Sequence, residues 1–256
     1  KNTVFPFLYN DIDYLKKLVK KENIKIIKME VSRNQGPKNN FLNKVKNLCK
    51  KNKIILIFDE CTSGFRENFG GLHLKYKINP DLAIFGKALG NGYAINAIIG
   101  NKETMIKAQE SFISSTFWTE RIGPTAALAT LKEMERIKSW EIIKKTGKKI
   151  KKKWKELATK YNLKIIIEGL DSLASFRFDS DLNLLYKTYI TQEMLKKKIL
   201  ASNSIYSCIH HHKHLEVYFK NLDIIFKNIS EFESGKKNIY HFLNSEVCNS
   251  TFSRLN

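Results

Sequence analysis

Two hydrophobic patterns alternate along the first half of the chain. Apolar residues at three- and four-residue spacing predict one helix, capped by Asn10 and running to about Lys21, and a second helix at 41–49. Apolar runs rich in β-branched residues predict strands at 24–31, 54–58 and 81–85. Strands that are apolar on both faces and separated by helices indicate an α/β fold, with a mainly parallel sheet covered on both sides.

The second half has a different pattern. From Gly123 a helical pattern runs through Ile137, and we expect it to continue into a lysine-rich helix. Short strands are predicted at 164–167, 172–178, 205–208 and 215–219, with helices at 190–200 and 222–232. This mixture indicates a small α+β domain. We therefore expect a first domain at 1–140, the small domain at 141–244 and a polar tail at 245–256.

The composition is that of a globular protein, with 43% hydrophobic and 27% charged residues. No apolar run approaches the roughly 20 residues of a membrane-spanning helix, so no membrane partner is expected. No secretory signal is recognisable at the start of the chain. The four cysteines show no paired CxxC spacing, which favours reduced thiols and a cytoplasmic protein.

The formal charge of +20 raises the question of a nucleic-acid partner. However, the basic residues are 39 Lys and only 6 Arg, whereas groove and phosphate recognition favours Arg. The densest run, 144–155, accompanies apolar residues at helical spacing, including Ile143, Ile150 and Trp154. Its lysines then fall mainly on the solvated face of a helix. The charge therefore makes nucleic-acid binding the less favoured interpretation.

Two motifs lie at the ends of predicted strands, IFDECTSGFR at 57–66 and NPDLAIFGKALGNG at 79–92. Asp59 ends one strand, and Lys87 follows the next strand by two residues. Ligands of parallel sheets bind at the carboxyl ends of strands, so both residues are candidates for one site. Together the motifs resemble those of the class III (subgroup II) aminotransferases, in particular the glutamate-1-semialdehyde aminomutase-like branch. The family's pattern is D-E-x-x-[ST]-G-F-R followed by P-D-[IL]-x-x-x-G-K-x-[IL]-G-x-G.

The resemblance implies fold type I of the pyridoxal-phosphate (PLP) enzymes, with residues 1–140 as the C-terminal portion of the PLP-binding large domain. It also implies that Lys87 is the Schiff-base lysine and that Asp59 faces the pyridine nitrogen of PLP. A buried carboxylate keeps that nitrogen protonated, so that the ring can accept electrons, and a primary amine can link to the coenzyme and later act as a base. Cys61 stands where the family commonly has Val beneath the ring.

A further residue is expected to bind the coenzyme phosphate, from a loop before the long interdomain helix and commonly across a subunit interface. Alignment of that helix puts Thr116 at this position, and Thr119 is the alternative if the register slips by three. The family's T-x-S-G-[NH]-P is replaced here by TFWTER at 116–121, and a helix-capping role for Thr116 stays open. The histidines at 210–212 and 214 lack a supporting Cys or carboxylate at ligand spacing, so we interpret them as a solvated loop and expect no metal site.

The activity that the resemblance implies is that of a PLP-dependent aminotransferase or aminomutase, acting on a small-molecule amino donor and carbonyl acceptor. A homodimer with shared active sites is expected with it. The family's Gly/Ser-rich phosphate loop is not recognisable between Lys1 and Ile54, which, with the absent initiator Met, predicts that an N-terminal part is missing here. The alternative is a non-catalytic protein, either a truncated remnant or a basic nucleic-acid-binding protein.

Overall fold

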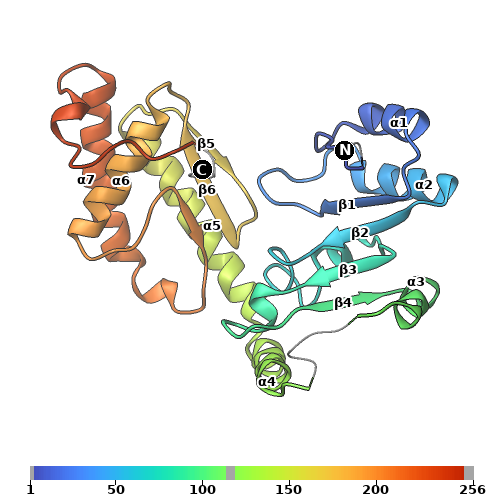
Figure 1. Ribbon diagram of the computed structural model, residues 1–256. Helices are drawn as coiled ribbons and strands as arrows, with labels where there is room; N and C mark the ends of the chain where they lie inside the picture. The colour runs from blue at the N-terminus through green and yellow to red at the C-terminus, as the bar shows by residue number, and fades with distance from the viewer. Residues whose placement is uncertain (1–2, 114–118, 251–256) are drawn as a thin grey trace. The chain divides into compact units, whose positions relative to one another are not determined.

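The computed structural model describes residues 3–113 and 119–250, and the chain divides into two compact units (Figure 1). The first unit is Lys1–Glu141 and the second is Ile142–Asn256. No helix within the described ranges is both long and apolar enough to cross a membrane. Each unit builds its own sheet and its own core.

The first unit is a four-stranded sheet with helices, in the order β1-β2-β3-β4 (Figure 1). Its elements are α1 (Ile12–Lys21), β1 (Ile26–Glu30), α2 (Phe41–Asn52), β2 (Ile55–Asp59), β3 (Leu82–Phe85), β4 (Ala97–Gly100), α3 (Lys102–Ile106) and α4 (Ile122–Ile137). Short 3₁₀ helices occur at η1 (Leu72–Tyr76), η2 (Lys87–Leu89) and η3 (Lys107–Glu110). The first three strands are parallel, and β4, which the sequence pattern did not predict, pairs antiparallel with β3. The predicted α/β fold with a mainly parallel sheet is confirmed.

Burial alternates along the strands of this sheet. In β2, Leu56 and Phe58 are fully buried, whereas Ile55, Ile57 and Asp59 are only partly buried. In β1, Ile27 and Met29 are buried, but Ile26 is 54% exposed. Side chains of alternate residues point to opposite faces of a sheet. Within the described residues, therefore, one face is fully covered and the other only in part, although the apolar runs predicted cover on both.

The second unit is an α+β structure, as its sequence pattern predicted. Helix α5 (Ser139–Lys160) leads into it, followed by β5 (Ile165–Glu168), β6 (Leu173–Phe178), α6 (Asn183–Lys196), β7 (Ser204–Tyr206), η4 (His211–Lys213), α7 (Leu215–Glu233) and η5 (Ile239–His241). The sheet is antiparallel in the order β5-β6-β7. Aromatic side chains form the centre of its core, where Trp154, Phe176 and Phe226 are buried and Phe176 contacts both of the others.

Three local predictions were wrong. The run 215–219, expected as a strand, is the first turn of α7, because Leu215, Tyr218, Phe219 and Leu222 are buried at helical spacing. The helix expected to run unbroken beyond Ile137 stops at Lys138, which adopts a left-handed conformation with φ +50° before α5 begins.

The third concerns the start of α1. Asn10, expected as the N-cap, is left-handed with φ +71°. Asp11 caps the helix instead, and its carboxylate accepts a hydrogen bond from the Tyr14 N–H at 2.9 Å.

Candidate active site

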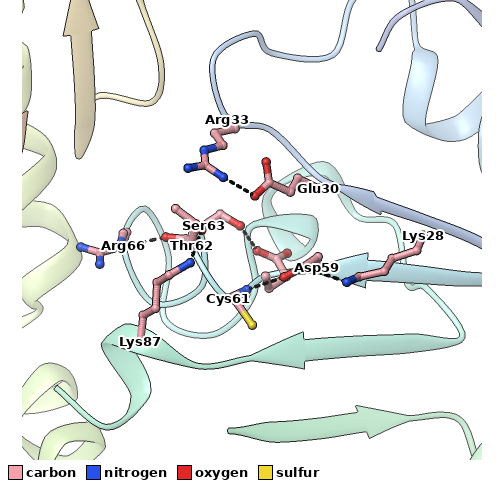
Figure 2. A network of polar contacts seen from close by, with 10 residues as sticks. Lys28, Glu30, Arg33, Asp59, Cys61, Thr62, Ser63, Arg66 and Lys87 are labelled. Atoms are coloured by element: carbon pink, nitrogen blue, oxygen red, sulfur yellow. Dashed lines mark hydrogen bonds and ion pairs between the residues drawn. The ribbon is translucent and has the colours of Figure 1, made fainter. Parts of the chain in front are cut away.

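The two sequence motifs meet at one edge of the first unit's sheet. Strand β2 ends at Asp59, and the neighbouring parallel strand β3 ends at Phe85, two residues before Lys87. Asp59 pairs with Ile84 in the register of the two strands. The carboxyl ends of parallel strands share an edge, and Figure 2 shows Asp59 and Lys87 on either side of the turn that follows β2.

Asp59 has a partner on each carboxylate oxygen. Oδ1 accepts a hydrogen bond from the Cys61 N–H at 3.1 Å, and Oδ2 lies 3.0 Å from the Lys28 ammonium (Figure 2). Burial alone would raise the pKa of Asp59, but the hydrogen bonds from Lys28 and Cys61 outweigh it and lower that pKa below its usual 3.8. The carboxyl group is therefore an anion at neutral pH.

Lys87 lies at the start of η2, with its amine turned toward the same turn. Its Nζ donates a hydrogen bond to Thr62 Oγ1 at 2.7 Å. Its backbone is left-handed, with φ +46°, a conformation that costs an L-residue other than Gly roughly 1–2 kcal/mol. Residues held in such conformations concentrate at functional sites, where the surrounding structure maintains them.

Cys61 lies between the two candidate residues. Burial, and then the neighbouring Asp59 carboxylate, raise the pKa of its thiol, so it stays neutral and behaves as a small apolar side chain. Gly86 brings the backbone before Lys87 close to it, since a Cβ at Gly86 would lie 3.4 Å from Cys61 Sγ and 2.3 Å from Asn96 Oδ1.

A buried polar network lies directly behind this turn. The fully buried Glu60 carboxylate accepts hydrogen bonds from the Ser63 hydroxyl at 2.5 Å and from the His73 backbone N–H at 2.9 Å. His73 Nδ1 lies 2.9 Å from the same carboxylate. Burial would raise the pKa of Glu60, but these donors outweigh it and lower the pKa. The network fixes the turn that carries Cys61 and Thr62.

The same turn is held from its other end. Arg66 Nε donates a hydrogen bond to the Thr62 carbonyl oxygen at 2.9 Å. On β1, Glu30 pairs with Asp59 in the strand register and forms an ion pair with Arg33 at 3.2 Å. At this edge of the sheet, therefore, the neighbouring carboxylates of Asp59 and Glu30 each have a cationic partner, as Figure 2 shows.

The expected phosphate residue, Thr116, lies outside the described residues. Thr119, the alternative, is exposed in a turn before α4. The cap of α4 comes from Glu120, whose carboxylate accepts hydrogen bonds from the N–H groups of Ile122 and Gly123, the latter at 3.0 Å.

The histidine run lies around η4 in the second unit. His211 Nδ1 accepts a hydrogen bond from the Cys208 N–H at 3.2 Å, and His212 Nδ1 lies 2.7 Å from the Ile209 carbonyl oxygen. In the described part of the chain, no group of three or more His, Cys, Asp or Glu side chains is arranged to hold a metal ion.

Sequence reasoning missed two residues of this site, Lys28 and Thr62. Lys28 interrupts an apolar strand, which is an anomaly that the sequence displays, but its partner follows only from the register of β1 with β2. Thr62 lies inside the first motif, yet nothing in the spacing indicates that its hydroxyl meets the Lys87 amine.

Comparison with known proteins places the chain in a family. Residues 21–230 match the model of the class-III aminotransferases. The 3-aminobutyryl-CoA aminotransferase of Cloacimonas acidaminovorans is 30% identical over 221 residues, which are 83% of this chain and 53% of that protein. The glutamate-1-semialdehyde 2,1-aminomutase of Sulfurisphaera tokodaii is 33% identical over 182 residues, 68% of this chain and 43% of that protein.

Solved structures agree at the level of the fold. The FumI protein of Sphingopyxis sp. MTA144, in its PLP internal aldimine form, aligns with a TM-score of 0.83 at 20% identity, over 90% of this chain and 58% of its own. The ornithine δ-aminotransferase of Plasmodium falciparum aligns with a TM-score of 0.77 at 20% identity, over 88% and 62%. The chain spans about half the length of the curated relatives that it matches. On the match to the family model, which covers most of its length, this chain belongs to the class-III aminotransferase family.

Proposed function

We propose that the protein is a PLP-dependent aminotransferase or aminomutase in which Lys87 links the coenzyme and Asp59 faces its ring nitrogen. The observation that carries this proposal is the convergence of an amine and a carboxylate on one turn. Lys87 Nζ bonds to Thr62 at 2.7 Å, and Asp59 Oδ1 bonds to the Cys61 N–H at 3.1 Å, so adjacent residues hold the two groups.

The donor set fits PLP in its chemistry. The coenzyme offers an aldehyde, for which a primary amine is the partner, and a basic ring nitrogen, for which an anionic carboxylate is the partner. The lowered pKa of Asp59 keeps that carboxylate charged. The neutral Cys61 thiol supports the proposal that this residue lies beneath the ring, and Thr116 is proposed as a phosphate ligand.

When bound, PLP supplies a ring that accepts electrons from a carbon losing a proton. The chain's own groups would do the rest. Asp59 would hold the proton on the ring nitrogen through its negative charge, and Lys87 Nζ, once free, would remove and return the proton at the substrate carbon. These two residues serve transamination and 2,1-mutation alike, so the proposal keeps both reactions, with a small-molecule amino donor and carbonyl acceptor as substrates.

A homodimer is part of the proposal, and exposed apolar side chains support it. In the first unit, Tyr93, Ile98, Ile99, Ile106, Phe112, Ile113, Ile122 and Leu128 are each at least 47% exposed. They all lie within 93–128, and exposed apolar side chains that gather into one patch are typical of a protein–protein interface. Light scattering should give twice the mass of one chain, and a monomeric mass would contradict the homodimer.

A cytoplasmic location is proposed as well, since the structure has four free cysteines.

The test of the proposal is coenzyme linkage to one lysine. PLP added to the protein should produce the absorbance band of a lysine-linked coenzyme, and borohydride trapping with peptide mass spectrometry should find the label on Lys87. Lys87→Ala should abolish both signals. Lys77→Ala is the matched control, because Lys77 is also exposed and also left-handed, with φ +56°. A Lys87→Ala protein that keeps the absorbance band would contradict the assignment of Lys87 as the coenzyme-linking residue.

A further inference from the structure

Lys28 occupies one of the two carboxylate oxygens of Asp59, the residue proposed to face the coenzyme ring. Its Nζ lies 3.0 Å from Asp59 Oδ2, while Oδ1 is already bonded to the Cys61 N–H (Figure 2). The parallel register pairs Lys28 with Ile57 and Glu30 with Asp59, so Lys28 projects from the same face of the sheet as Asp59, two residues nearer the start of the strands. Its flexible side chain reaches along that face to the strand ends.

The Lys28 ammonium also stabilises the sheet, independently of any ligand. Asp59 is only 25% exposed and lies beside Glu30 in the register, and two like charges in neighbouring strands destabilise a sheet. Glu30 has a cationic partner of its own, because it forms an ion pair with Arg33. Lys28 supplies the matching cation for Asp59, and its own side chain stays 56% exposed.

We propose that Lys28 sets the affinity for the coenzyme by competing with the ring nitrogen for Asp59 Oδ2, and this inference rests on the proposed function above. Lys28 acts through Asp59 and is a positioning residue. A protonated ring nitrogen that bonds to Oδ2 would meet a carboxylate already neutralised by a second cation. That carboxylate then stabilises the ring proton less than a free one would.

Orientation of the carboxylate does not depend on Lys28 alone. The Cys61 N–H fixes Oδ1 from within the turn, and the Glu60 network behind it holds that turn in place. Neutralising Lys28 therefore leaves Asp59 oriented and removes the competing charge. Two effects of opposite sign follow: the coenzyme-free protein loses stability, and the coenzyme binds more tightly. A merely structural lysine would lower both stability and affinity when replaced.

The experiment compares wild type with two neutral variants, Lys28→Met and Lys28→Gln. If one of them does not fold, the other is sufficient for the test. Lys28→Arg keeps the charge and should bind the coenzyme as wild type does. Lys25→Met is the matched control, since Lys25 is an exposed lysine just before the same strand. Titration with PLP, followed by the lysine-linked absorbance, should show about 3- to 10-fold tighter binding for the neutral variants at low salt, a difference that shrinks in about 1 M salt. In the coenzyme-free protein, carboxyl NMR should show a raised pKa of Asp59 in the same variants.

The outcomes separate this inference from the function on which it rests. Tighter binding in Lys28→Met and Lys28→Gln that disappears in an Asp59→Asn background supports it. Unchanged or weaker binding in those variants, with a normal band in wild type, overturns the inference and leaves the proposed function intact. If wild type shows no absorbance band of a lysine-linked coenzyme, the proposed function itself is overturned. The proposed competition between Lys28 and the ring nitrogen is then overturned as well. An unchanged pKa of Asp59 in the neutral variants also counts against the contact.

Discussion

The two units bury different kinds of polar group. Among the described residues, and apart from its buried Trp and Tyr side chains, the second unit buries only Ser and Thr hydroxyls, at Thr146, Ser172, Thr188 and Ser207. The first unit also buries Ser32, Thr62, Ser63 and Ser139, and it buries carboxylate and imidazole groups too, at Glu60, Glu67 and His73. Glu60 and His73 contact one another directly behind the turn that carries Asp59, Cys61 and Thr62.

This difference separates packing from chemistry. Buried ionisable groups need paired donors and acceptors to offset their desolvation, and they are found where function requires an oriented charge. The second unit instead gains its stability from apolar burial around Trp154, Phe176 and Phe226. Substitutions in the second unit should therefore change stability, whereas those around the Asp59 turn should change stability less and site chemistry more.

The largest effect is expected from Trp154→Ala. The Trp154 ring is fully buried against Phe176, and its Nε1 donates a hydrogen bond to the Tyr218 hydroxyl at 2.9 Å. The cavity and the lost bond should lower the free energy of unfolding by about 3–5 kcal/mol, measured by urea unfolding. Trp140→Ala is the matched control, because Trp140 is only half-buried. An equal loss in both variants would argue against the apolar core as the main stabiliser of the second unit.

A smaller effect, with a characteristic pH dependence, is expected from Glu60→Gln. The amide cannot match the charge-assisted hydrogen bonds from Ser63 and His73. The free energy of unfolding at neutral pH should therefore be lower by about 1.5–3 kcal/mol. The pKa of Glu60 is lower in the folded chain than its usual 4.5. Its stabilising contribution is therefore complete above pH 4.5 and is lost as the pH falls through the folded-state value.

Denaturant titrations at several pH values test this sign. The difference between wild type and Glu60→Gln should be largest near neutral pH and should narrow in acid. Glu156→Gln offers a surface control in the second unit, where the glutamate side chain is 49% exposed. A difference that grows in acid would show that the pKa of Glu60 is raised rather than lowered.

The sequence predicted which residues lie at one edge of the first unit's sheet, but it did not predict the side-chain contacts that these residues make. Asp59 and Lys87 could be assigned to one edge, because each follows an apolar strand and parallel strands end together. The contact between Lys28 and Asp59 depends on the register of two strands, which the apolar run at 24–31 does not define. The bond from Lys87 to Thr62 depends on the shape of a turn, which no periodicity encodes.

The wrong predictions have equally physical causes. Residues 215–219 are apolar except for Glu216 and span only five residues, a window in which helix and strand spacing overlap. The break before α5 falls at Lys138, where no Gly or Pro marks it, because the left-handed cap is formed by a lysine. Strand β4 has only four residues and follows a Gly-rich stretch, so its apolar pattern is too short to stand out.

The smallest effect concerns the backbone of Lys87. Gly adopts its left-handed conformation without strain, so Lys87→Gly should be more stable than Lys87→Ala by about 1 kcal/mol, although both should lose the lysine-linked coenzyme band. The same pair of substitutions at Lys77, also left-handed, should show a similar difference and keep the band. Urea unfolding of the four variants measures the first quantity and absorbance with PLP the second. Equal stability of Lys87→Gly and Lys87→Ala would mean that the left-handed backbone at Lys87 carries no strain.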